Sequence, residues 1–276
     1  MAMVFLGVFW LSPWIVNYAR NLYWVEFTWF VPMLIGLICS NNIDNKRKIK
    51  CCFGFMYLAV LIKCLCGYEY ISVIMLGGVF FLIADWLKEI VVNHDYAHAR
   101  KIFFVLAKVS LLALLGFLSA LVIHSFIRGK GNITAGLTDI FQRDILRRTF
   151  GGNPSDFSLE YADSLNVSVG QVLERYFHFK TQIVLGVEGE LFPVLVFIPL
   201  LLFTWDWYKD KIDYDEVSLY FLSFVTCISW FVLGKAHSYI HDSLNYVCWY
   251  FGFIQICIYC IVKRVENFAE KYVGSL

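Results

Sequence analysis

Charged residues are scarce in this sequence. Only 16% of the 276 residues are Asp, Glu, Lys or Arg, whereas 59% are apolar and the mean hydropathy is +0.64. A soluble domain is about half apolar and about a quarter charged. The formal net charge of +1 provides no basic surface for nucleic acid. The composition therefore argues against a soluble domain or a nucleic-acid partner and favours an integral membrane protein.

The long polar segment contains no cysteine, and no basic region precedes the first apolar run. The nine cysteines all lie in, beside or at the end of apolar runs, which is typical of small buried apolar side chains rather than a disulfide framework. Because no basic region precedes its apolar run, the N-terminus does not fit the signal-peptide pattern. The chain also has no internal repeat and no low-complexity segment.

Long apolar runs fill most of the remaining chain. A membrane span needs about 20 mostly apolar residues. Eight segments approach this length, at 2–17, 22–40, 51–66, 70–87, 102–125, 187–205, 217–234 and 246–263. They predict an all-α polytopic bundle of about eight transmembrane helices. We expect five spans in residues 1–125, an extracytoplasmic loop with surface helices at 126–186, and three spans with a short cytoplasmic tail at 187–276.

Lysine and arginine in the short connections predict the orientation of the bundle. "NNIDNKRKIK", residues 41–50, carries four basic residues, and short basic connections stay in the cytoplasm. The connection with Lys88, Arg100 and Lys101 falls on the same side, as does the C-terminal tail. Long loops cross the membrane largely regardless of their charge, so the arginines of the long loop do not oppose this orientation. We expect both termini to be cytoplasmic.

The long loop has two helical patterns. "LTDIFQRDILRRTF", residues 137–150, has apolar residues at helical spacing and stops at the Gly-Gly-Asn-Pro sequence that follows. "SVGQVLERYFHF" opens with Ser168 and Gln171 at capping-box spacing. Both segments are typical of amphipathic helices on the outer membrane surface.

Two histidine pairs suggest metal binding. "HDYAH", residues 94–98, and "HSYIHD", residues 237–242, each place two imidazoles four residues apart, on one helical face. The predicted topology puts the first pair inside and the second outside, about 30 Å apart. One metal cluster cannot use both pairs. Two histidines and an aspartate could still hold one zinc ion, but the expectation is no metal at either pair. The first segment is interpreted as a hydrated helix end, and His241 with Asp242 as the hydrated part of a turn.

A second candidate site lies near the N-terminus. A Ser-Pro turn at Ser12 interrupts the first span, and Arg20 and then Glu26 follow before the next one. Glu26 lies among aromatic residues close to the hydrocarbon. An ionisable group in that position is costly and marks a functional site by default. A structural ion pair of Glu26 with Arg20 or Lys235 is the alternative.

The stretch "SPWIVNYARNLYWVEFTWFVPML", residues 12–34, resembles the third span, second outer loop and fourth span of polytopic GT-C glycosyltransferases. These enzymes take sugars from polyprenyl-phosphate donors on the outer face of a membrane. The resemblance implies that Glu26 is the catalytic acidic residue and orients a divalent metal, Mg²⁺ or Mn²⁺, or contacts the donor phosphate. It implies that Arg20, with Lys235 and His237 on the same side, binds that phosphate.

The resemblance begins at what would be the third span. The usual catalytic base of the family lies in the first outer loop and has no counterpart here, so the resemblance implies a weak or inactive enzyme, or a fragment of one. It also implies a lipid or glycan acceptor and a bacterial inner (plasma) membrane. The competing hypothesis is a non-catalytic membrane protein, either a transporter or an assembly scaffold. The enzyme hypothesis expects Arg20, Glu26, Lys235 and His237 to converge on one outward-facing cavity.

Overall fold

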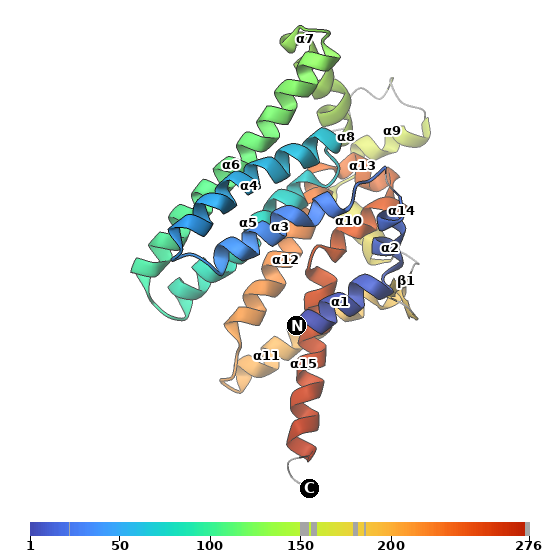
Figure 1. Cartoon of the computed structure of the whole chain (residues 1–276). Helices are drawn as coiled ribbons and strands as arrows, with labels where there is room; N and C mark the ends of the chain where they lie inside the picture. The colour runs from blue at the N-terminus through green and yellow to red at the C-terminus, as the bar shows by residue number, and fades with distance from the viewer. Residues whose placement is uncertain (22, 150–154, 156–158, 179–181, 185, 274–276) are drawn as a thin grey trace.

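The protein is a bundle of helices with one small hairpin of strands (Figure 1). The computed structural model describes residues 1–21, 23–149, 155, 159–178, 182–184 and 186–273. The first half contains α1 (Ala2–Leu11), α2 (Pro13–Ala19), α3 (Phe27–Ser40), α4 (Lys46–Cys66), α5 (Ile71–Val91), α6 (Tyr96–Arg128), α7 (Ile133–Ile140), the π-helix η1 (Phe141–Leu146) and α8 (Arg147–Thr149). The second half contains α9 (Leu159–Asn166), α10 (Val169–Phe177), β1 (Gln182–Val184), β2 (Val187–Glu188), η3 (Gly189–Leu191), α11 (Phe192–Tyr208), α12 (Tyr214–Leu233), α13 (Lys235–Ile240), α14 (Asp242–Asn245), η4 (Tyr246–Tyr250) and α15 (Phe253–Val273). The prediction of an all-α membrane bundle is confirmed.

The number of membrane spans is smaller than predicted. Among the described residues, five helices are long and apolar enough to cross a bilayer, and two bent helix pairs raise the number to seven. The first pair is α1 with α2, bent by 71°, and the second joins residues 242–250 to 253–270 at 49°. The remaining predicted span, 22–40, contains only the 14-residue helix α3, because its first residues form the connection that carries Glu26. The chain is therefore an integral membrane protein with five to seven candidate spans.

Glycines allow the central helices to cross closely. A Cβ atom on Gly36 of α3 would lie 2.2 Å from the carbonyl oxygen of Gly78 in α5. A Cβ atom on Gly116 of α6 would lie 2.5 Å from the carbonyl oxygen of Tyr57 in α4. Small residues at such crossings let backbones approach and pack, which is the main source of helix association in lipid. These contacts join α3 to α5 and α4 to α6.

The cysteines behave as predicted. All nine are free thiols, and seven are buried; Cys51 and Cys66 are the exposed ones. Thiols in these positions pack as small apolar side chains.

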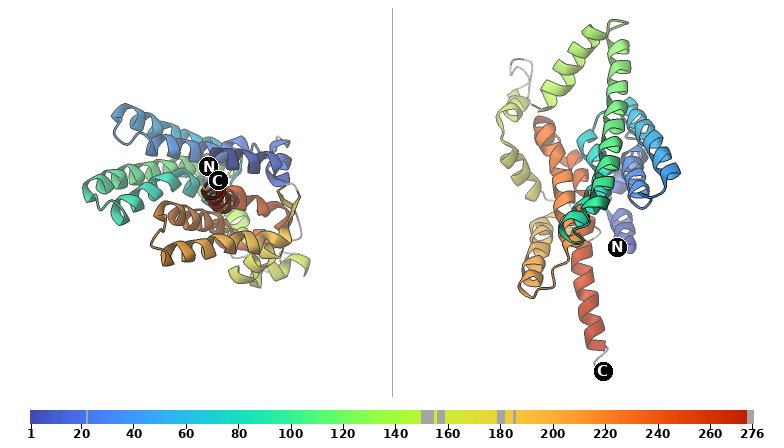
Figure 2. Two further views of the ribbon diagram at one scale, coloured as in Figure 1. Left: turned by 90° about the horizontal axis from the view of Figure 1, so that it is seen from below. Right: turned by 90° about the vertical axis from the view of Figure 1, so that its left-hand side faces the viewer.

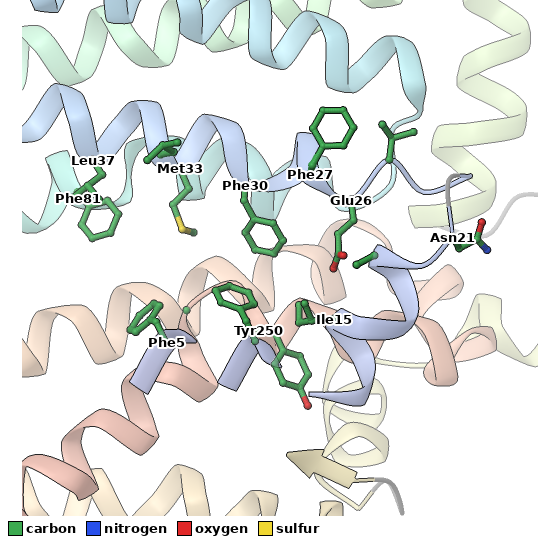
Figure 3. A pocket seen from close by; sticks show the side chains of 15 residues that line it. Phe5, Ile15, Asn21, Glu26, Phe27, Phe30, Met33, Leu37, Phe81 and Tyr250 are labelled. Atoms are coloured by element: carbon green, nitrogen blue, oxygen red, sulfur yellow. The ribbon is translucent and has the colours of Figure 1, made fainter. Parts of the chain in front are cut away.

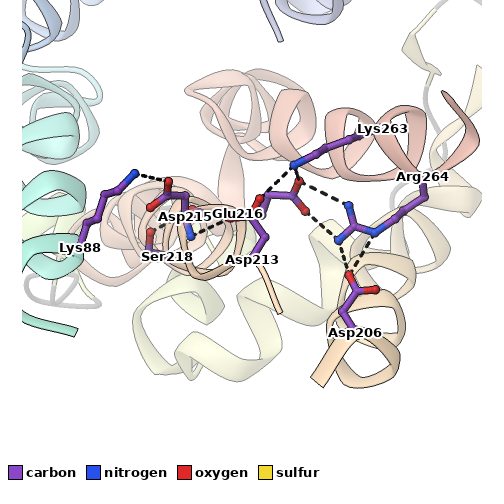
Figure 4. Close-up of polar contacts among 8 residues, drawn as sticks. All are labelled: Lys88, Asp206, Asp213, Asp215, Glu216, Ser218, Lys263 and Arg264. Atoms are coloured by element: carbon purple, nitrogen blue, oxygen red, sulfur yellow. Dashed lines mark hydrogen bonds and ion pairs between the residues drawn. The ribbon is translucent and has the colours of Figure 1, made fainter. Parts of the chain in front are cut away.

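Ion pairs hold three helices together at one end of the bundle (Figure 4). Glu216 of α12 is 3% exposed and binds both Lys263 and Arg264 of α15. Arg264 also binds Asp206 of α11, and Lys263 lies 2.9 Å from Asp213. Breaking a buried pair by removing one partner is costly because the other charge stays buried. This network fixes α15 against α11 and α12 at the end that we expect to face the cytoplasm.

The opposite end carries a cap of short helices. Helices α2, α8, α9, α10, α13 and α14 gather there, whereas the turns after α3, α5 and α11 lie at the other end (Figure 1). The turn between α6 and α7 projects beyond this cap in two views (Figure 1, Figure 2). Tyr176 of α10 donates a hydrogen bond of 2.7 Å to the carbonyl oxygen of Ser238, which ties the long loop to α13.

The long loop is only partly as predicted. The capping box at Ser168 and Gln171 is present and begins α10. The segment before it is more complex than one helix, since α7 passes into the π-helix η1 and then α8. The predicted stop at Gly151 to Pro154 lies outside the described residues. Residues 187–188 form a strand rather than the start of a span, because they pair with β1.

Candidate active site at Glu26

An apolar groove of about 580 Å³ runs along one side of α3 (Figure 3). We call it the Glu26 groove. Its lining comes from α1, α2, α3, α5 and the turn around Tyr250, and consists of Phe5, Phe9, Ile15, Ala19, Asn21, Val25, Glu26, Phe27, Phe30, Met33, Leu34, Leu37, Phe81, Tyr250 and Gly252. Lining residues from 26 to 37 extend over about 16 Å of helix at 1.5 Å per residue. The groove is therefore long, and its lining is almost wholly apolar.

The break between α1 and α2 creates one wall of this groove. Ser12 has an extended backbone, and its hydroxyl oxygen accepts a hydrogen bond of 3.3 Å from the amide of Ile15. Pro13 then starts α2, since proline is suited to the first turn of a helix. The resulting bend of 71° turns α2 away from α1. Aromatic residues of α1 and Ile15 of α2 therefore face the same groove from two directions.

Glu26 supplies the one carboxyl group of the lining. It is 6% exposed, and in Figure 3 its carboxyl group points into the groove. Its Oε1 atom has no hydrogen-bond partner among the described residues. The residue lies in the connection between α2 and α3, outside the candidate spans. Burial raises the pKa of Glu26 to about 8, because an apolar surrounding disfavours the carboxylate. An uncharged acid at neutral pH can donate a hydrogen bond to an anionic ligand.

Phe27 and Leu34 show where the groove opens. Both line it, and their side chains are 72% and 55% exposed. Leu34 belongs to the apolar helix α3, so this opening is bordered by apolar side chains. Such an opening is suited to the entry of a hydrophobic chain.

Arg20 ends α2 near this groove but is not part of its lining. It is exposed, and its backbone amide closes the helix. The next residue, Asn21, does line the groove, and its side-chain oxygen accepts a hydrogen bond of 3.0 Å from the amide of Tyr23. The sequence alternative of an ion pair between Glu26 and Arg20 or Lys235 is absent within the described part of the chain.

Lys235 lies in the outer cap and not in the groove. Its Nζ atom donates a hydrogen bond of 3.2 Å to the carbonyl oxygen of Leu165 in α9. This bond connects the start of α13 to the long loop, so the ammonium group of Lys235 has a structural role.

His237 also lies inside the cap. Its Nδ1 atom is 3.2 Å from Nδ2 of Asn245, and its ring centroid is 4.6 Å from that of His241. Burial, with the nearby positive charge of Arg148, lowers the pKa of His237 to about 3. The imidazole is therefore neutral at physiological pH and is a weak partner for a phosphate.

The prediction that the four sequence candidates converge on one cavity is therefore wrong. Glu26 lines the groove, Arg20 lies beside it, and Lys235 and His237 face other parts of the cap.

Within the cap, the hydroxyl of Tyr18 donates a hydrogen bond of 2.9 Å to the carbonyl oxygen of Leu244. This contact packs α2 against α14.

The described residues do not fit a resident divalent metal. No group of three His, Cys, Asp or Glu side chains in that part of the chain could hold one. The two histidine segments lie at opposite ends of the bundle (Figure 1). Glu26 has no second carboxylate in the groove lining, whereas Mg²⁺ and Mn²⁺ prefer several oxygen ligands. We derive no step through a metal ion.

Sequence reasoning found Glu26 but missed most of the groove. Phe5, Phe81 and Tyr250 come from three distant parts of the chain, and each is one of many aromatic residues in an apolar run. Only the Ser-Pro break gave a signal, since it marked a change of direction near Glu26.

No protein-family model, no curated protein and no solved structure matches this chain.

Proposed function

We propose that this chain is a membrane glycosyltransferase, or part of one, which binds a polyprenyl-phosphate-linked sugar with its hydrocarbon in the Glu26 groove. One observation supports the proposal: a buried carboxyl group, whose Oε1 atom has no partner among the described residues, lies in a long apolar groove bordered by exposed apolar side chains. A lipid-linked donor has the matching shape, an apolar chain that ends in a polar phosphate and sugar. The proposed setting is a bacterial inner membrane, with the groove at the extracytoplasmic face and both termini in the cytoplasm.

The chemistry follows from the protonation of Glu26. In the proposed reaction the acceptor hydroxyl oxygen, on a lipid or a glycan, bonds to the anomeric carbon of the sugar. The bond from that carbon to the phosphate oxygen breaks, and the electron pair leaves with the polyprenyl phosphate. Glu26 in its acid form donates a hydrogen bond to the leaving phosphate and stabilises the charge that develops there. The proton of the acceptor passes to a general base that the groove lining does not supply, so we expect weak or no transfer by this chain alone.

Arg20 fits this scheme as the cationic contact of the phosphate. It precedes the groove residue Asn21 and is exposed at the expected outer end. A guanidinium group is suited to a phosphate because it donates two parallel hydrogen bonds. The donor-phosphate role of Lys235 and His237 stays a prediction that the groove does not support.

Binding and transfer can be measured separately on the reconstituted protein. Native mass spectrometry with a polyprenyl phosphate measures binding, and a radiolabelled lipid-linked sugar measures transfer. We expect Leu34→Trp to fill the mouth of the groove and weaken binding at least tenfold, whereas Leu58→Trp on the exposed side of α4 leaves it unchanged. Glu26→Leu, which cannot donate a hydrogen bond, should retain binding of the lipid chain but lower transfer by about 10²-fold, the usual cost of removing one donor to a developing negative charge.

Two results would count against the proposal. Equal polyprenyl phosphate affinity of the Leu34→Trp and Leu58→Trp variants would show that the groove is not the lipid site. Unchanged transfer by Glu26→Leu would remove Glu26 from the reaction.

A non-catalytic membrane protein is the second candidate function. It is favoured by Lys235 and His237, which are used in contacts within the cap instead of facing the groove. In that case the groove binds a lipid as a structural or transported ligand. Lipid binding without sugar transfer, in a preparation that includes any upstream coding sequence, would support this candidate over the enzyme.

A further inference from the structure

The helical hairpin at the outer end of α6 is a closely packed unit. A Cβ atom on Gly136 of α7 would lie only 1.8 Å from the carbonyl oxygen of Ser125 in α6, so only glycine permits this approach. The turn between the two helices uses Gly131 with φ of +97°, and Asn132 caps α7 by accepting a hydrogen bond of 3.1 Å from the amide of Ala135. The hairpin therefore holds α7 and η1 in a fixed orientation on α6.

One face of this hairpin exposes a row of apolar side chains. Ile133, Leu137, Phe141 and Ile145 recur every four residues and are all exposed. The row continues the exposed apolar surface of α6, where Phe126 and Ile127 lie just before the turn. An apolar window of α6 is long enough to cross a bilayer, and the whole helix of 33 residues is longer than the hydrocarbon requires. The exposed apolar residues at the end of α6 and on α7 and η1 are therefore suited to the boundary between acyl chains and headgroups.

A cationic hollow lies on the same hairpin. It measures about 710 Å³ and is lined by four cations, Arg128, Lys130, Arg143 and Arg147, with the two carboxylates of Asp139 and Asp144. The lining thus carries a surplus of two positive charges.

The two carboxylates orient arginines of the hollow. Arg128 lies 2.5 Å from Asp144 and 3.6 Å from Asp139, and Arg143 lies 3.0 Å from Asp139. Arg143 nevertheless remains 77% exposed. Guanidinium groups held in this way still present donors to a further anion. The π-helix contributes Arg143 and Asp144, and such helices are rare and frequent at functional sites.

We propose that the α6–α7–η1 hairpin is a binding site for anionic phospholipid in the outer leaflet. The apolar row enters the boundary between headgroups and acyl chains, and the cationic hollow binds the lipid phosphate. An amphipathic helix with basic residues beside its apolar face is suited to this position. The proposal does not depend on the reaction at Glu26.

Local hydrogen exchange of residues 133–149 tests this site. Short-chain phosphatidylglycerol is titrated into the detergent-solubilised full chain, and protection of these amides gives an apparent Kd. Each removed cation should raise the Kd about fivefold, since a basic residue at an anionic surface contributes ~1 kcal/mol. We therefore expect about 25-fold weaker binding for the variant Lys130→Gln with Arg143→Gln. The matched control, Lys209→Gln with Lys211→Gln, neutralises two exposed cations at the opposite end and should leave the Kd unchanged.

Further variants and ligands in the same exchange measurement distinguish the possible ligands. Leu137→Gln with Phe141→Gln keeps the charges and should abolish protection by the lipid, because the apolar row no longer enters the acyl region. Millimolar inorganic phosphate should give little protection, whereas full protection by it would identify a site for free phosphate and overturn the lipid proposal. Equal protection by phosphatidylcholine and phosphatidylglycerol would overturn it as well. A change from monomer to dimer that accounts for the protection would assign the row to a second copy of the chain instead.

Discussion

At the residue scale, Glu26 makes the stability of the protein depend on pH. Its pKa is about 8 in the folded protein and 4.5 ordinarily, so the folded state keeps a proton that the unfolded state loses between these values. Stability therefore falls as the pH rises from about 5 to about 8, by roughly 4 kcal/mol at 1.4 kcal/mol per pH unit. We predict that Glu26→Gln removes most of this slope, measured as the Tm of the detergent-solubilised protein.

Glu174→Gln is the matched control for that measurement, because Glu174 is exposed on α10. It should keep the slope of the unmodified protein. An equal slope in Glu26→Gln would mean that the carboxyl group is hydrated rather than buried in the groove.

His237 predicts a dependence of opposite sign. Its folded pKa is about 3, below the ordinary value of 6.5, so below pH 6.5 the unfolded state binds a proton that the folded state excludes. Stability is complete above about pH 6.5 and falls as the pH drops toward 3. At pH 5 the loss should be about 2 kcal/mol. His237→Gln should flatten this acid limb of the Tm profile, whereas His98→Gln at the other end of the bundle should not. A profile for His237→Gln that still falls by the same amount would assign the acid limb to other groups.

At the element scale, close crossing of α3 and α5 depends on Gly36. A methyl group there would lie 2.2 Å from the carbonyl oxygen of Gly78, in backbone that cannot rotate away. We predict that Gly36→Ala destabilises the bundle by roughly 1–3 kcal/mol, the usual cost of overpacking. Gly54→Ala is the control, since a Cβ atom at Gly54 of α4 meets no atom within 4 Å. It should be neutral or stabilising by about 0.5–1 kcal/mol, because alanine is the better helix former. A Tm for Gly36→Ala at or above that of Gly54→Ala would contradict this close crossing.

Local patterns predicted the helices well where the relevant interaction is local. The apolar runs located the spans, and Ser168 with Gln171 predicted the start of α10 because a capping box needs only residues three positions apart. The strand at 187–188 and the π-helix η1 were missed. The strand pairs with residues 182–184 just before it, in a hairpin too short to show an alternating sequence pattern. The run at 22–40 overestimated α3, because hydropathy does not register the connection before it.

The candidate site was predictable to the extent of one residue. The sequence drew attention to Glu26 because it is an ionisable side chain among aromatic residues. Placing such a group in apolar surroundings is costly, and the structure buries Glu26 in an apolar groove. The separation of Lys235 and His237 from the groove could not be foreseen, because a shared side of the membrane does not imply a shared cavity. The contact of Lys235 with Leu165 arises only when the long loop packs on α13, whereas the contact of His237 with Asn245 forms between the short helices α13 and α14.

At the scale of the whole molecule, the arrangement of loops predicts one orientation in the membrane. The turns after α3, α5 and α11 lie at the same end of the bundle, and the turn after α3 leads into the basic start of α4 (Figure 1). Short basic connections stay cytoplasmic, so this end should face the cytoplasm. The outer cap and the Glu26 groove then belong to the extracytoplasmic half.

Charge neutralisation tests this orientation. Replacing Lys46, Arg47, Lys48 and Lys50 with glutamine removes the strongest orienting charge, and we predict a mixed population in which a C-terminal reporter is outside in a measurable fraction of molecules. Replacing Lys130, Arg143, Arg147 and Arg148 of the long loop removes the same number of charges but should leave the reporter in the cytoplasm, because long loops cross largely regardless of charge. A reporter of the unmodified chain outside, or a stronger effect of the loop variant, would reverse the assignment and place the Glu26 groove in the cytoplasmic half. A lipid-linked sugar presented on the outer face could then not reach Glu26, so this measurement bears directly on the proposed reaction.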